Sequence, residues 1–287
     1  MRRKPCRKFH PSAGRSDRGE AVTIHQAIFA DWLVPRGGQK YDLRAWALDL
    51  QVLRECGVDR VVLGLGRRHY LLPAARYGDV LAACDAAYDY GIEPWVMAWA
   101  VRSKAWLAGD LPRFVEVADY AHAAGVVLDC ERGWHRGTVD AEEAAEQAGG
   151  AIGSCLPWAV TGLAQCQPSV QPLARLAPVV IPQAYSVWQL GDTAGGRRPI
   201  RSDAPPRCQI RAWQSWSSHV TDPRSIDLGL GCYWLARPGK AREACLTGQL
   251  LAAEHAGCNR VWWWSLKWLR AQRWVQTILR GYSGATC

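Results

Sequence analysis

Short apolar runs alternate with amphipathic stretches along the chain, from about residue 22 to its end. The runs are bordered by Gly or charged residues, which is typical of buried parallel strands. We expect strands at residues 22–30, 60–66, 93–100, 126–131, 157–161, 179–185, 228–235 and 260–265.

The stretches between these runs carry apolar residues at helical spacing. We expect helices at residues 43–56, 77–90, 110–124, 139–152, 169–176, 240–256 and 270–280. Four of them end close to a glycine that precedes the next strand: Gly57, Gly91, Gly125 and Gly257. Glycine is the usual residue just after the C-terminal end of a helix. This repeated helix–Gly–strand unit predicts a single (β/α)8 barrel of the TIM type, for which 287 residues is a normal length.

A doubly wound open sheet is the alternative architecture, because it also alternates strands with helices. No G-x-G-x-x-G follows the first predicted strand, which disfavours a dinucleotide-binding sheet. We therefore divide the chain into a flexible basic N-terminal segment, residues 1–20, and a barrel domain, residues 21–287.

One connection, residues 186–227, is long and rich in Gly, Pro and Arg, and it contains Trp188, Trp213 and Trp216. Long loops in compact domains are usually functional or disordered. We expect this connection to form a wall of a cleft, with a short helix at residues 208–217.

The composition adds 16 Trp against 3 Phe, and a net charge of +9. Sugar-binding clefts use flat aromatic rings, although a coding bias that replaces Phe by Trp would give the same count. The charge favours an anionic partner, or it belongs to a solvated tail. Nucleic acid is disfavoured, because the basic residues are not interleaved with aromatic residues and match no reading motif.

The 11 cysteines form no C-x-x-C and no zinc-like cluster with histidine, so we expect reduced thiols, no metal and no cofactor. The basic N-terminus is not followed by an apolar segment, and no stretch reaches the ~18 apolar residues of a membrane span. We expect synthesis in the cytoplasm without a signal peptide, and no membrane span.

The strongest chemical signal lies in the strand predicted at residues 126–131. Because strand side chains alternate, Asp129 and Glu131 point to one side and Cys130 to the other. Active sites of barrels lie at the C-terminal ends of the strands, which is where this pair is placed. Two close carboxyls raise the pKa of one of them, and a glycosidase needs such a protonated acid. The alternative is a helix-capping pair, or a surface salt bridge with Arg132.

Other candidates follow predicted strands. Trp99 and Trp264 lie at strand ends and would offer stacking surfaces for a sugar, unless they belong to the core. Three arginines also follow strands and would recognise a carboxylate or phosphate on a substrate: Arg67, Arg68 and Arg102.

The string from Val126 to Glu131 resembles the strand-four D-x-E of the barrel glycoside hydrolases of the chitinase and muramidase group, which includes lysozyme-like enzymes. Two further segments are similar to that group: Gln183 and Tyr185 after the sixth strand, and Trp264 on the eighth. Asp31 follows the first strand, where the muramidase branch carries an acidic residue. The chain departs from the group where Ala124 and Val127 replace the earlier aspartates of the chitinase signature, and where Gln183 and Tyr185 replace the muramidase aspartate.

The resemblance implies that Glu131 is the general acid and that Asp129 orients a substrate N-acetyl group or steadies positive charge. It also implies that Tyr185 hydrogen-bonds the acetamido group and that Asp31 holds a neighbouring sugar or water. Our leading hypothesis is a glycosidase acting on peptidoglycan or a related N-acetylated polysaccharide, in the context of a phage or prophage lysis protein that is released to the cell wall. The alternative is a catalytically inactive barrel that binds glycan or serves as a structural component of a phage-like assembly.

Overall fold

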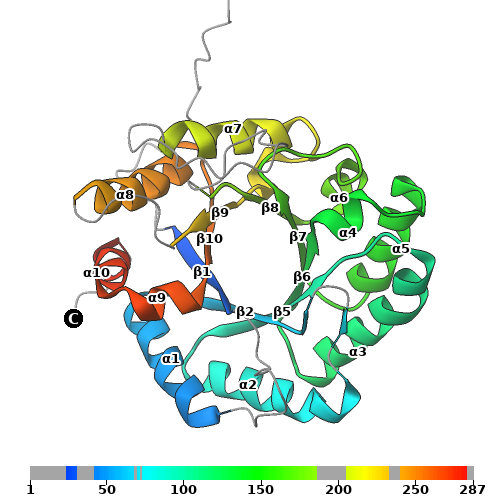
Figure 1. The fold of residues 1–287 in the computed structure, drawn as a ribbon, viewed down its shortest axis with the longest axis horizontal. Coiled ribbons are helices and arrows are strands. Elements are labelled where there is room, and N and C mark those ends of the chain that lie inside the picture. The colour runs from blue at the N-terminus through cyan, green and yellow to red at the C-terminus, as the bar shows by residue number, and fades with distance from the viewer. Residues whose placement is uncertain are drawn as a thin grey trace, which may run out of the picture.

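The computed structural model describes residues 24–30, 42–67, 70–71, 73–185, 205–232 and 240–282. The predicted basic segment at residues 1–20, the candidate site residue Asp31, and Arg68 and Trp188 lie outside the described residues. The described chain forms a (β/α)8 barrel of the TIM type, in which a closed ring of parallel strands is surrounded by helices (Figure 1). The ring closes between the first and last strands, so the alternative of an open doubly wound sheet is wrong.

The predicted strands are all present, although several of their ends differ by a few residues. The barrel strands are β1 (His25–Ala30), β2 (Arg60–Gly64), β5 (Glu93–Trp99), β6 (Gly125–Cys130), β7 (Trp158–Leu163), β8 (Val179–Gln183), β9 (Leu228–Gly231) and β10 (Arg260–Trp264). Their order around the barrel is β1-β10-β9-β8-β7-β6-β5-β2, and each neighbouring pair is parallel. A short antiparallel pair that the sequence did not predict, β3 (Gly66–Arg67) and β4 (Tyr70–Leu71), follows β2.

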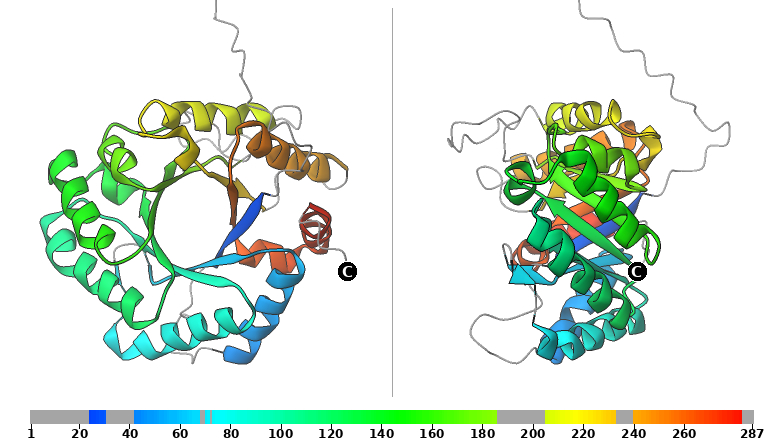
Figure 2. Two further views of the ribbon diagram at one scale, coloured as in Figure 1. Left: turned by 180° about the vertical axis from the view of Figure 1, so that it is seen from behind. Right: turned by 90° about the vertical axis from the view of Figure 1, so that its right-hand side faces the viewer.

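The helices cover the outside of the strand ring, as the views from behind and from the side show (Figure 2). They are α1 (Leu43–Glu55), α2 (Tyr77–Asp89), α3 (Leu111–Tyr120), α4 (Arg132–His135), α5 (Ala141–Gly153), α6 (Gln171–Leu176), α7 (Pro205–Ser217), α8 (Lys240–His255), α9 (Leu266–Ala271) and α10 (Arg273–Tyr282). The described residues also include the single-turn helices η2 (Ala74–Arg76), η3 (Trp106–Asp110) and η4 (Pro223–Ser225). The carboxylates of Asp42 and Asp140 accept backbone N–H groups at the starts of α1 and α5, as capping residues do. Among the described helices, none is long and apolar enough to cross a membrane.

Three of the four glycines that were predicted to end helices have the left-handed backbone that this role requires, with φ of 71° at Gly57, 69° at Gly91 and 73° at Gly257. The prediction for Gly125 is wrong. After α3 the left-handed position is His122, with φ of 53°. Gly125 instead begins β6, where a Cβ would lie 2.6 Å from the Trp95 ring, so this glycine allows the indole to approach the backbone.

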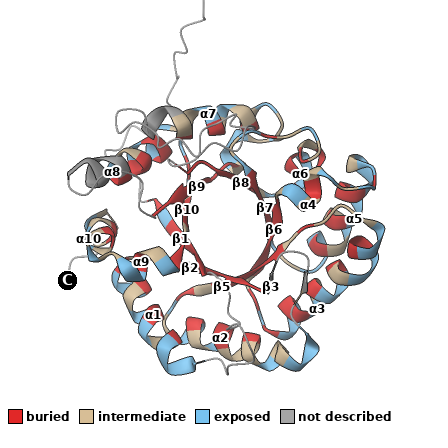
Figure 3. Ribbon diagram, viewed as in Figure 1, coloured by how far each residue is buried: buried red, intermediate tan, exposed pale blue. Residues whose placement is uncertain are grey.

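Two apolar layers are buried, one inside the barrel and one between the barrel and the helices (Figure 3). The interior layer consists of alternate strand residues: Ala27, Phe29, Val62, Trp95, Met97, Val127, Ala159, Ile181 and Trp262. The residues between them on the same strands, such as Val126, Leu128 and Cys130 on β6, pack outward against the helices. This alternation decides which side chains point into the barrel.

Only residues 205–227 of the long connection are described, so its expected role as a cleft wall stays a prediction for residues 186–204. Its described part contains α7, which begins three residues before the predicted helix and includes Trp213 and Trp216. Trp216 is fully buried and donates its indole N–H to the carbonyl of Leu163 at 3.1 Å, and Trp213 packs against the same outer core. The two indoles therefore attach α7 to the outside of the barrel.

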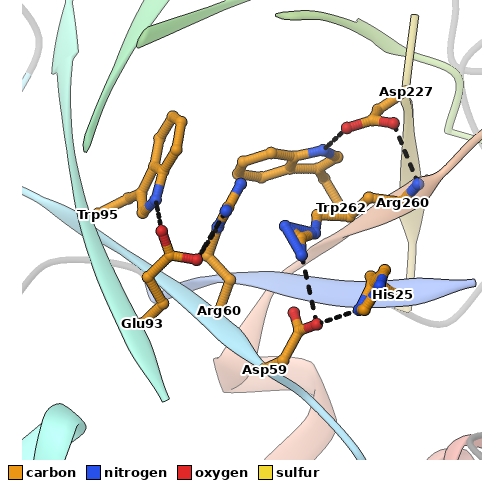
Figure 4. Close-up of polar contacts among 8 residues, drawn as sticks. All are labelled: His25, Asp59, Arg60, Glu93, Trp95, Asp227, Arg260 and Trp262. Carbon is orange, nitrogen blue, oxygen red and sulfur yellow. Dashed lines mark hydrogen bonds and ion pairs between the residues drawn. The ribbon is translucent and has the colours of Figure 1, made fainter. Parts of the chain in front are cut away.

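A layer of charged residues lies at the N-terminal end of the barrel (Figure 4). The Arg60 guanidinium contacts Glu93 at 2.6 Å and lies 4.2 Å from the centre of the Trp95 ring. Asp59 contacts both His25, at 2.6 Å, and Arg260, at 3.2 Å. This layer was not predicted from the sequence, and it lies at the opposite end of the barrel from Asp129 and Glu131.

Candidate active site

The acid pair lies on the inner side of β6. Val127 belongs to the interior apolar layer, so Asp129 and Glu131, two and four residues further on, continue that inward-facing row. Asp129 is only 2% exposed, whereas Glu131 is half-buried just beyond the strand's C-terminal end. Cys130 points outward into the helix-facing core, as predicted.

The alternative roles for this pair do not fit the described residues. Glu131 stands at the position before α4, but its side chain makes no capping hydrogen bond there. Its backbone carbonyl instead accepts the N–H groups of Trp134 and His135, each at 3.0 Å. Asp129 is buried in the barrel, whereas Arg132 is exposed.

Gln183, the last residue of β8, connects the two carboxyls. Its amide donates to Asp129 Oδ1 at 3.2 Å, and it also lies close enough to Glu131 to lower the pKa of that carboxyl. Burial raises the pKa of Asp129 well above its usual range, and the nearby charge of Glu131 raises it further. Burial also raises the pKa of Glu131, and the hydrogen bonds from Gln183 lower the pKa of both groups without cancelling these shifts. The pair therefore keeps a proton to a higher pH than either carboxyl would alone.

The predicted aromatic residues surround this end of the barrel. Trp99 is the last residue of β5 and is the register partner of Asp129. Trp264 is the last residue of β10, and its ring centre lies 6.3 Å from that of Tyr185. Trp99 and Trp264 are each half-buried, and Tyr185 is 9% exposed. The structure thus places Asp129, Glu131, Gln183, Tyr185, Trp99 and Trp264 at the C-terminal end of the strands.

Two neighbours of the site were missed by the sequence analysis. Phe29 on β1 packs against Trp264 with ring centres 5.0 Å apart. Thr161 on β7 is the register partner of Asp129, is buried, and donates its hydroxyl to the carbonyl of Ile181 at 2.8 Å. Alternation within each strand would have placed both residues inside the barrel, but only the register between strands shows what they contact.

Arg102 makes contacts within the protein, and its role in recognising a substrate stays a prediction. Its Nε and one terminal nitrogen donate to the backbone carbonyls of Trp134 and Val139, so these two donors are engaged within the protein. Of the other two arginines, Arg67 lies in β3 and Arg68 lies outside the described residues. Within the described ranges, no group of three or more His, Cys, Asp or Glu side chains is placed to hold a metal ion.

No protein-family model matches the chain, and no curated protein is detectably similar to it in sequence. Many solved structures share its fold. The spore cortex-lytic enzyme SleL of Bacillus cereus is 10% identical, with a TM-score of 0.61 over 92% of this chain and 76% of SleL. GH5_18 of Streptomyces cattleya, solved in complex with GlcNAc, is 14% identical, with a TM-score of 0.61 over 92% of this chain and 82% of that one.

A class V chitinase of Pseudomonas fluorescens Pf-5 is 12% identical, with a TM-score of 0.60 over 92% of this chain and all of the chitinase, 100%. At these identities the likeness is one of fold. The chain is a (β/α)8 barrel whose similar solved structures include barrel glycoside hydrolases.

Proposed function

We propose that this chain hydrolyses a glycosidic bond in an N-acetylated glycan, with bacterial peptidoglycan as the leading substrate. One observation carries the proposal: Asp129 near the end of β6 and Glu131 just beyond that end lie close enough to influence each other, and both have a raised pKa. A carboxyl pair that retains one proton supplies the acid that glycoside hydrolysis needs.

In the proposed reaction Glu131 is the general acid, because it is the less buried of the two and lies beyond the C-terminal end of β6. Its proton passes to the glycosidic oxygen as the bond from that oxygen to the anomeric carbon breaks. The carbonyl oxygen of the substrate's acetamido group attacks the anomeric carbon, and water then opens the cyclic intermediate, returning a proton to Glu131. Asp129 orients the acetamido group and steadies the positive charge that develops on it.

The aromatic residues around the pair support a sugar as the substrate. Trp99 and Trp264 present half-buried rings of the kind on which sugar faces stack, and the Tyr185 hydroxyl is proposed to hydrogen-bond the acetamido group. The structures with similar folds include a spore cortex-lytic enzyme, a GlcNAc complex and a chitinase, which supports the choice of N-acetylated glycans to be tested. Asp31 as a sugar-holding residue, and a phage or prophage lysis context, stay predictions.

The test compares Glu131→Gln with Glu146→Gln, which makes the same change on the exposed side of α5. Clearing of a peptidoglycan suspension and release of reducing ends from chitooligosaccharides are measured for each variant and for the unaltered protein. We expect Glu131→Gln to lose at least about 100-fold in rate, the usual contribution of a general acid, with an unchanged melting temperature. Glu146→Gln should retain full activity.

Equal rates for the unaltered protein and Glu131→Gln would overturn the proposal. If both are inert but still sediment with peptidoglycan or chitin, the chain is instead a glycan-binding barrel without catalysis. Cosedimentation in parallel with the rate assay therefore separates the two functions.

A further inference from the structure

The chain that follows Glu131 is tied to Arg102, a residue of the loop after β5. The Arg102 carbonyl accepts the N–H groups of Thr138, at 2.8 Å, and Val139, at 3.3 Å. Its guanidinium donates through Nε to the carbonyl of Trp134 at 3.1 Å, and through another nitrogen to the carbonyl of Val139. One residue therefore binds the segment 132–139 by both its backbone and its side chain.

Gly137 shows how closely this segment approaches Arg102. A Cβ at position 137 would overlap both the Cβ and the carbonyl oxygen of Arg102, so only glycine fits there without movement. The contact is therefore a close backbone packing in addition to the hydrogen bonds.

The opposite side of the same segment is held by the loop after β7. Trp134 is fully buried and donates its indole N–H to the Ser169 carbonyl at 2.6 Å. The His135 Nδ1 lies 2.9 Å from the Ser169 hydroxyl. Burial and the charge of Arg102 both lower the pKa of His135, which favours its neutral form in this contact. The short helix α4 is thus fixed between loops on its two sides.

Glu131 is joined to this fixed helix through its own backbone, because its carbonyl accepts the N–H groups of Trp134 and His135. We propose that Arg102 is a positioning residue: by anchoring α4 it sets the place of the Glu131 carboxyl beside Asp129 and Gln183. This inference rests on the proposed function for its catalytic consequence. Its structural consequence, the environment of the Glu131 carboxyl, can be measured independently of any activity.

The experiment uses the full chain and three variants. Arg102→Met removes the guanidinium but keeps the length of the side chain, and Arg102→Lys restores one donor. Arg113→Met is the control, because Arg113 is an exposed arginine of α3 whose partner is Asp110 of the preceding turn. For each protein, kcat and KM on an N-acetylated glycan, the carbon-13 NMR titration of the Glu131 carboxyl, and the melting temperature are recorded.

We expect Arg102→Met to lower kcat by roughly 10- to 100-fold with little change in KM, since small displacements of a reacting group cost rates of this order. Arg102→Lys should recover part of the loss. In Arg102→Met the Glu131 carboxyl should titrate at lower pH, because a carboxyl released from its buried position approaches its ordinary pKa. Arg113→Met should match the unaltered protein in every measurement.

The outcomes separate the two proposals. An unchanged Glu131 titration together with an unchanged kcat in Arg102→Met overturns the positioning role. If the unaltered protein and Glu131→Gln are equally inert, the proposed function fails, but a shifted titration in Arg102→Met still supports positioning. If Arg102→Met does not fold, the same two measurements on Arg102→Lys decide, and an unaltered titration in that variant counts against the inference.

Discussion

The indole N–H of Trp262 donates a 2.8 Å hydrogen bond to the carboxylate of Asp227 in the charged layer at the N-terminal end of the barrel (Figure 4). Asp227 also accepts the backbone N–H of Arg260 at 3.1 Å. Burial outweighs these contacts and raises the pKa of Asp227 from 3.8 to about 6. Because the Asp227 carboxyl binds a proton more tightly in the folded state than in the unfolded state, the stability of the protein depends on pH.

The first prediction concerns this dependence. Because the folded pKa lies above the unfolded one, the contribution of Asp227 to stability is fully present below about pH 4 and is lost as pH rises through about 6. The free energy of unfolding of the unaltered protein, minus that of Asp227→Asn, should fall by roughly 2 to 3 kcal/mol from pH 4 to pH 7, since one pKa unit corresponds to about 1.36 kcal/mol. Urea unfolding at several pH values measures it. A difference that does not vary with pH would contradict the expectation.

The second prediction concerns Arg60, whose pKa is lowered by burial first and by the charge of Arg260 second. Glu93 opposes this shift, so Glu93→Gln leaves a poorly solvated cation between the rings of Trp95 and Trp262. We expect a loss of roughly 1 to 2 kcal/mol in stability, below the range for breaking a fully buried pair, because the Glu93 side chain is 38% exposed. Glu142→Gln, which removes the exposed ion pair with Arg175, should cost less than about 1 kcal/mol. Equal melting temperatures for the two variants would show that the charged layer is not stabilised by this pair.

The third prediction concerns Gln183 and depends on the proposed function. Its hydrogen bonds lower the pKa of Asp129 and Glu131, so Gln183→Leu should let both carboxyls hold their proton to a higher pH. The alkaline limb of the kcat/KM profile should therefore move to higher pH in Gln183→Leu. Gln147→Leu, on the exposed face of α5, is the control and should leave the profile in place. A shift to lower pH in Gln183→Leu is the contrary result.

The fourth prediction concerns Gly125, where a Cβ would meet the Trp95 ring at 2.6 Å. We expect Gly125→Ala to destabilise the protein by about 1 to 3 kcal/mol, the usual cost of overpacking a core. Gly150→Ala is its counterpart, because a Cβ there meets nothing within 4 Å and the position is helical. That change should stabilise α5 by up to about 1 kcal/mol. If denaturant titrations show the same sign for both variants, the close approach of Trp95 is not the reason for this glycine.

The barrel was predictable because its strands differ from its helices in hydrophobic spacing, and because Gly57, Gly91 and Gly257 mark three helix ends. The same rule failed at Gly125, since a glycine before a strand can serve either a left-handed turn or a close ring contact. Sequence does not distinguish these two uses. Likewise, Trp213 and Trp216 lie in the connection after β8, where residues of a cleft would also be expected. Both belong to α7, which packs them against the outer core.

For the site, period-two alternation was enough to place Asp129 and Glu131 on one side of β6. The link from Asp129 to Gln183 crosses 54 residues and depends on the register of the strands between them, which local pattern does not reveal. The contacts of Arg102 could not be predicted for a related reason. An arginine that follows a strand has the same sequence context whether it binds a substrate or a neighbouring loop. The hydrogen bonds of Arg102 to backbone carbonyls can be seen only in the structure.

The barrel closes by pairing β1 with β10, so that His25 lies beside Arg260. A truncated product that stops before residue 260 would leave β1 and β9 each with an open parallel edge of unpaired N–H and C=O groups. Such edges are templates for aggregation, and contacts between residues this far apart form late in folding. Fragments that lack the C-terminal strand should therefore accumulate as insoluble material, and the newly synthesised chain depends on its last strand for protection against self-association.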